Sequence, residues 1–137
     1  MFEAVHTERS SAAPTAVWAL WADASRWPDW NDQLESGEIE GELAVGAGAT
    51  VKFKRGGKMR FTVIAVEPER LFVDEAKLPG CRLRHEHRIE PAGSGCEITH
   101  RLSVEGPTSG LFSRLLGRKR IEKSVISFIE RERALAE

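Results

Sequence analysis

Between residues 33 and 106 the sequence consists of short segments in which polar and apolar residues alternate, separated by turns rich in glycine and proline. The separators include Gly56-Gly57, Pro79-Gly80 and the stretch 91–95. A parallel crossover needs about a dozen residues or more, so connections this short favour antiparallel hairpins. The pattern predicts six antiparallel strands, over 34–41, 50–55, 58–66, 71–78, 81–90 and 96–105.

Other patterns flank this run of strands. Residues 2–10 alternate weakly and predict a half-buried strand. The next segments, 14–23 and 27–30, predict two short helices. Near the C-terminus the apolar spacing becomes helical again and predicts a long amphipathic helix over 108–136, which Gly117 interrupts or kinks.

Composition excludes several classes of protein. The chain has 137 residues with 20 Lys and Arg against 21 Asp and Glu, so it has no strong positive field and nucleic acid is not an expected partner. No apolar run approaches the roughly 20 residues that cross a bilayer, so no stable membrane insertion is expected. Because Met1–Ser10 carries charges where a secretory signal would be apolar, we expect a cytoplasmic protein. In that compartment Cys81 and Cys96 remain thiols.

The order of the predicted elements indicates an α+β architecture in one domain, 1–137. A curved antiparallel sheet needs its apolar face covered, and only the C-terminal helix is long enough to cover it. Wherever side chains do not fill the space between sheet and helix, a concave and mainly apolar pocket remains.

Several landmarks resemble those of a known superfamily. They are Ala13-Pro14, Val17-Trp18, Asp23, the segment Trp27-Pro28-Asp29-Trp30, the hairpin from Glu90 to Gly95, Gly106 and the closing helix. With these landmarks the chain is similar to the START-like superfamily of polyketide cyclases/dehydrases and lipid transport proteins. The resemblance implies a helix-grip fold, in which a curved antiparallel sheet wraps around a long C-terminal helix, and a hydrophobic cavity. That superfamily has no universal catalytic signature, so the resemblance leaves the chemistry open.

Three of the four histidines fall on inward-facing positions of neighbouring strands. Alternation places His85 and His87 on the apolar face of one strand, and His100 on the apolar face of the next. If the hairpin pairs Ile89 with Ile98, His87 lies directly opposite His100. A register slip of one residue would separate them.

This histidine group has three interpretations. It forms the polar end of a ligand cavity, with His87 or His100 as a candidate catalytic base; or it consists of buried core histidines; or it binds zinc. No carboxylate that could orient the imidazoles is identifiable, so neither a metal nor a cofactor is expected. Asp74 could be such a carboxylate, but aspartate is so seldom buried that a solvent-exposed edge is favoured.

Aromatic and charged groups are mostly interpreted as structural. The four tryptophans, at 18, 21, 27 and 30, are expected to fill the junction of the two short helices, with Trp30 lining the cavity entrance. The basic run 118–120 lies near Glu122, Glu130 and Glu132, which favours a solvated helix face.

The sequence therefore predicts a protein that binds a small hydrophobic or amphipathic molecule between sheet and helix. The expected ligand-binding residues are Trp30, Phe53, Phe61, Leu83, His85, His87, His100, Val125 and Ile129. One alternative is a cyclase/dehydratase-like enzyme with an inward histidine as general base; because the chain lacks tyrosine, a tyrosine acid is excluded. Another is an interaction module whose cavity is filled by its own side chains. A homodimer is compatible with each of them.

Overall fold

A computed structural model describes residues 1–137 and shows seven antiparallel strands in one curved sheet, in the order β1-β7-β6-β5-β4-β3-β2. The strands are β1 (Phe2–Ser10), β2 (Leu34–Ile39), β3 (Gly48–Phe53), β4 (Lys58–Glu67), β5 (Leu71–Leu78), β6 (Cys81–Ala92) and β7 (Gly95–Glu105). All seven predicted strands are present. The N-terminal strand β1 pairs with β7 and completes one edge of the sheet.

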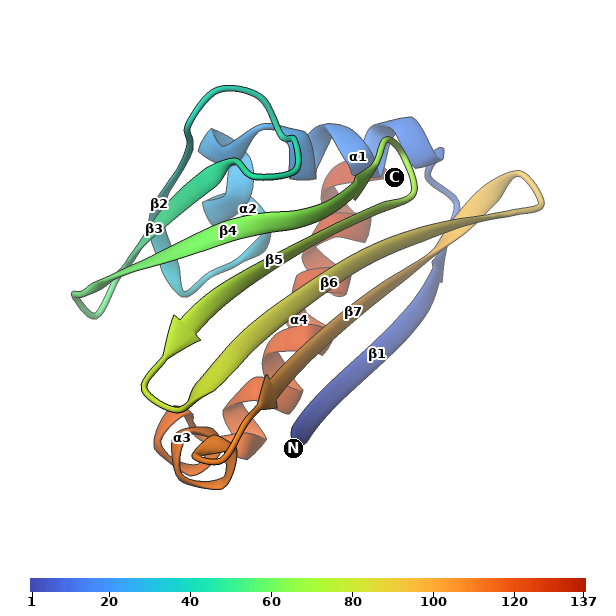
Figure 1. The fold of residues 1–137 in the computed structure, drawn as a ribbon. Coiled ribbons are helices and arrows are strands. Elements are labelled where there is room, and N and C mark those ends of the chain that lie inside the picture. The colour runs from blue at the N-terminus through green and yellow to red at the C-terminus, as the bar shows by residue number, and fades with distance from the viewer.

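The helices lie on the concave side of this sheet, with α4 crossing behind the strands in the view of Figure 1. They are α1 (Pro14–Ala22), the short 3₁₀ turn η1 (Ala24–Arg26), α2 (Trp27–Trp30), α3 (Ser109–Leu116) and α4 (Arg118–Ala136). Helix α4 packs against β1 and β7, and α1 and α2 close the adjoining end. This is the predicted helix-grip fold.

The C-terminal helix is divided at Gly117. Its backbone has φ 88° and ψ 98°, a left-handed conformation that favours glycine because a Cβ is strained there. The chain therefore changes direction between α3 and α4. The predicted interruption at this glycine is confirmed.

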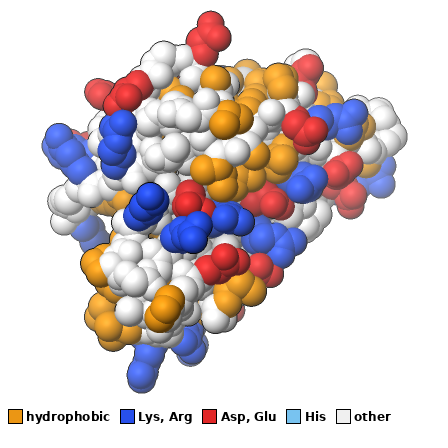
Figure 2. Space-filling model, in the orientation of Figure 1, with side chains coloured by type: hydrophobic (Ala, Val, Ile, Leu, Met, Phe, Trp, Pro, Cys, Tyr) orange, Lys and Arg blue, Asp and Glu red, His pale blue; other side chains and the backbone are white.

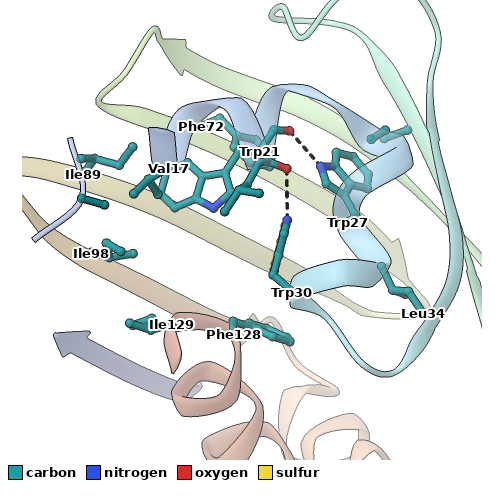
Figure 3. Close-up of a cluster of buried hydrophobic side chains, with 14 of the residues drawn as sticks. Val17, Trp21, Trp27, Trp30, Leu34, Phe72, Ile89, Ile98, Phe128 and Ile129 are labelled. Carbon is teal, nitrogen blue, oxygen red and sulfur yellow. Dashed lines mark hydrogen bonds between the residues drawn. The ribbon is translucent and has the colours of Figure 1, made fainter. Parts of the chain in front are cut away.

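Tryptophan side chains fix the short helices to each other (Figure 3). The indole N–H of Trp27 donates to the carbonyl oxygen of Trp21 at 2.8 Å, and that of Trp30 donates to the carbonyl oxygen of Leu20 at 3.1 Å. These bonds and the apolar packing around them confirm the structural interpretation of the aromatic cluster. Trp30 is only 3% exposed, so it lies in the interior and not at an entrance.

The outer face of the sheet is charged, and Figure 2 shows basic and acidic side chains side by side across it. Arg84 on β6 pairs with Glu75 on β5 at 2.9 Å, and Arg101 on β7 pairs with Glu3 on β1 at 2.7 Å. The inward and outward faces assigned from alternation are therefore correct. None of the helices combines the length and apolar character that crossing a bilayer requires.

Candidate functional site

A pocket of about 160 Å³ opens between the concave face of the sheet and helices α2 and α4. Of its 20 lining residues, 13 are hydrophobic, so its wall is mainly apolar. Arg120, at the start of α4, is the one exposed residue of the wall and marks the mouth. A dry apolar cavity of about 150 Å³ holds a benzene molecule, so this space suits a single ring.

Six of the nine expected ligand-binding residues line this pocket. They are Trp30, Phe53, Phe61, Leu83, His85 and His87. The other three, His100, Val125 and Ile129, are buried but are not part of the wall. The pocket is smaller than the roughly 300 Å³ at which ligand pockets usually begin, so the interaction module with a filled cavity stays an alternative prediction.

The predicted register of the β6–β7 hairpin is confirmed, because Ile89 pairs with Ile98 and His87 pairs with His100. The ring of His87 is stacked between its neighbours, with centroids 3.7 Å from both the Phe72 ring and the His85 ring. Nε2 of His85 lies 2.7 Å from Nδ1 of His100, within hydrogen-bond distance. The three inward histidines therefore form one contiguous group.

Glu132 completes this group from helix α4. Its side chain is fully buried, and its two carboxyl oxygens lie 2.8 and 2.9 Å from Nε2 of His100. The indole N–H of Trp21 donates to the same carboxyl at 2.6 Å. The expectation that Glu132 lies on a solvated helix face is wrong, because α4 turns this position toward the sheet.

His87 has a backbone partner of its own. Its Nδ1 lies 3.1 Å from the carbonyl oxygen of Phe72, which can only accept, so Nδ1 carries the proton. A neutral imidazole then has its lone pair on Nε2. The backbone of β5 thus fixes the tautomer of a pocket-lining histidine.

Asp74 is the second buried carboxyl at this site. It is 6% exposed, lies opposite His85 in the β5–β6 register, and lines the pocket. Its Oδ1 atom has no hydrogen-bond partner. The favoured expectation of a solvent-exposed edge is therefore wrong, and the carboxyl that contacts one of the three inward histidines is that of Glu132 instead.

Burial controls the protonation of all these groups. It lowers the pKa of His100 to about 3, and lowers the pKa values of His85 and His87 well below their usual range. It raises the pKa of Asp74 to about 8, and raises the pKa of Glu132 well above its ordinary value. The inner end of the pocket therefore presents neutral imidazoles and a carboxylic acid that can donate a proton to a hydrogen bond.

Comparison with protein families gives one match over the whole chain. The model of the family described as polyketide cyclase/dehydrase and lipid transport matches residues 1–137. No curated protein matches the chain in sequence.

Solved structures share the fold at low sequence identity. Protein MLL2253 from Mesorhizobium loti is 19% identical with a TM-score of 0.79, over 98% of this chain and 96% of that chain. Norcoclaurine synthase from Thalictrum flavum, in complex with dopamine and hydroxybenzaldehyde, is 17% identical with a TM-score of 0.72, over 98% and 85%. The Aha1 dimer from Colwellia psychrerythraea is 15% identical with a TM-score of 0.72, over 99% and 97%. At sequence identities this low, the structural similarity establishes a common fold alone.

Proposed function

From the premise that the chain belongs to the polyketide cyclase/dehydrase and lipid transport family, we propose that it binds a small carbonyl compound of about single-ring size in the pocket between sheet and helix. The apolar wall surrounds the ring. The carbonyl oxygen lies at the inner end, beside Asp74 and His85. The fold and the family support ligand binding in general, and the site supports this class of ligand.

The unpartnered oxygen of Asp74 is the observation that carries the proposal. A buried polar atom without a partner costs about 1–3 kcal/mol, and such groups are seldom retained without a role. Since its pKa is raised to about 8, Asp74 is mostly protonated at neutral pH and can donate its O–H to an oxygen of the ligand. A carbonyl oxygen is an acceptor only, and so it matches this donor.

The remainder of the wall selects the body of the ligand. Phe53 on β3, Phe61 on β4 and Leu83 on β6 line the pocket on the side of the sheet. Aromatic and aliphatic walls offer dispersion contacts and exclude water, so they favour a ring without further charges. Gln33 also lies in the wall. Its side-chain amide nitrogen already donates a hydrogen bond to the hydroxyl of Ser124, at 2.6 Å.

A pair of matched probes tests this specificity. Acetophenone and α-methylstyrene have nearly the same shape, but the second replaces the carbonyl oxygen by a methylene group. Titration calorimetry should show acetophenone binding about 10-fold more tightly, the value of one net hydrogen bond. Equal affinity for the two probes would contradict the role of Asp74.

A second pair of variants tests the location. Leu83→Trp places a larger side chain in the pocket and should abolish binding of acetophenone. Ile64→Trp makes a similar change at an exposed position of β4 outside the pocket wall, and should leave binding unchanged. Binding that survives Leu83→Trp, with the fold intact by circular dichroism, would place the ligand elsewhere.

A further inference from the structure

We propose that His85, His87 and His100 bind a divalent transition-metal ion, with zinc as the best fit. One ring nitrogen of each residue lies within 4.8 Å of one ring nitrogen of each of the others. His85 and His87 are two residues apart on β6, and His100 faces them from β7. Three neutral imidazoles with one open coordination position are a ligand set of catalytic zinc sites.

The hydrogen bonds around the histidines are those that orient metal ligands. A ligating histidine usually donates its other ring N–H to a carboxylate or a backbone carbonyl. His100 has Glu132 at Nε2, which leaves Nδ1 for a metal, and His87 has the Phe72 carbonyl at Nδ1, which leaves Nε2. The sequence alone showed no orienting carboxylate, and helix α4 supplies it.

The spacing requires a small adjustment when an ion enters. With bonds of about 2.0–2.1 Å, two nitrogens of a tetrahedral zinc site lie about 3.3 Å apart. The 2.7 Å between His85 and His100 must therefore open, and the wider separations must close. His85 is only half-buried and lies in the pocket wall, so its ring has space to move. The ion takes the place of the proton that these two nitrogens otherwise share.

Two buried carboxyls and the open pocket lie next to the histidine group. Asp74 and Glu132 are buried carboxyls, and neither forms an ion pair with Lys or Arg. Glu132 contacts His100, and Asp74 lies opposite His85 in the β5–β6 register, so both carboxyls border the proposed ligand set. His85 and His87 line the pocket, so the open coordination position faces the space available to water or to an oxygen of a ligand.

Metal binding by the whole protein tests this proposal directly. After dialysis against a chelator, calorimetric titration should show one equivalent of Zn²⁺ bound, and Co²⁺ should give the intense visible absorption of a tetrahedral site. His85→Ala should abolish both signals. Glu132→Gln should weaken Zn²⁺ binding about 10- to 100-fold, the usual effect of changing a residue that orients a ligand.

His6 provides the matched control. It is the fourth histidine of the chain, its side chain is 30% exposed, and its Nε2 lies 2.9 Å from Glu8, outside the three-histidine group. His6→Ala should leave both signals unchanged. If His85→Ala does not fold, the Co²⁺ spectrum of the unaltered protein tests the proposal instead. Bound Co²⁺ without the absorption of a tetrahedral site would overturn it. Absence of Zn²⁺ binding, or equal loss in His6→Ala, also overturns it. None of these measurements uses acetophenone, so the two proposals fail separately.

Discussion

At the scale of single residues, the buried Asp74 lowers the stability of the protein, and the proposed carbonyl ligand would supply the partner that it lacks. Its Oδ1 atom is buried without a partner. Asp74→Leu removes this atom, and we expect the free energy of unfolding to rise by about 1 kcal/mol because an unsatisfied buried group costs about that or more. The same variant should lose the preference for acetophenone over α-methylstyrene. Chemical denaturation and calorimetry measure the two effects.

The control for this change is Glu97→Leu on the exposed face of β7, which should alter stability by less than about 0.5 kcal/mol. A loss of stability in Asp74→Leu, with Glu97→Leu unchanged, would indicate that Asp74 has a partner in the folded protein. The oxygen of the ligand would then need a different donor at the inner end of the pocket.

Asp74 also predicts a pH dependence of stability. Burial raises its pKa from 3.8 to about 8, so between these values the folded chain keeps a proton that the unfolded chain releases. Stability falls with pH wherever the unfolded state binds fewer protons. The unaltered protein should therefore lose stability relative to Asp74→Leu as pH rises from about 4 to about 8, with little further change above that range. Denaturant midpoints of the two proteins across this range measure the difference, and parallel curves would contradict it.

Glu132 has the opposite role at this scale, because it satisfies two buried groups. Glu132→Ala leaves the Trp21 N–H and His100 without their partner, and we expect a loss of about 3 kcal/mol in the free energy of unfolding. Glu130→Ala, an exposed change two residues earlier on α4, should cost less than about 0.5 kcal/mol. Urea denaturation of both variants compares them, and similar losses would show that the buried contacts of Glu132 add nothing.

For some residues of the site the sequence pattern predicts that the side chain faces the interior, and for others it was misread. Strand alternation is sufficient to place His85, His87 and His100 inward, because its period of two has only two phases. Glu132 was missed although it lies four residues after Phe128 and three after Ile129, on the apolar stripe of α4. Helical spacing alone could have found it. Glu132 was assigned to the solvated face because carboxylates are usually exposed, even though its helical spacing placed it on the apolar stripe.

At the scale of secondary structure elements, Gly117 determines where the C-terminal helix divides. Gly117→Ala forces a Cβ into a left-handed backbone conformation and should cost about 1 kcal/mol or more. Gly110, inside α3, has open space at its Cβ position, so Gly110→Ala should stabilise the protein by about 0.4–1 kcal/mol. Thermal unfolding of the two variants should therefore shift in opposite directions. A shift in the same direction would contradict the assigned conformation of Gly117.

The elements themselves could be predicted better than the turns between them. Each strand was identified from alternation and turn residues, with ends within a few residues. The separator at 91–95 is shorter in the structure, because Pro91 and Ala92 still pair with Cys96 and Gly95. The remaining turn needs a positive φ, which Gly93 provides at 57°. Glycines and prolines mark where a turn lies, but cross-strand pairing decides how short it becomes.

At the scale of the whole molecule, the fold and the place of the pocket follow from the sequence, but the volume of the pocket does not. A covered antiparallel sheet was predictable because the chain offers a single long amphipathic helix for its apolar face. The volume between them depends on how side chains from α2, α4 and six strands interdigitate, and each rotamer changes it. That packing placed His85 and His87 in the pocket wall and His100 outside it.

The central claim is that the space between sheet and α4 accepts a ring-sized ligand. Two-dimensional ¹H–¹⁵N NMR of the protein titrated with acetophenone tests it most directly. We predict saturable chemical-shift changes at the backbone amides of Phe61, Asp74 and Leu83, which line the pocket from three different strands. Shifts confined to the outer face of the sheet, or no saturable shifts at any amide, would contradict the claim.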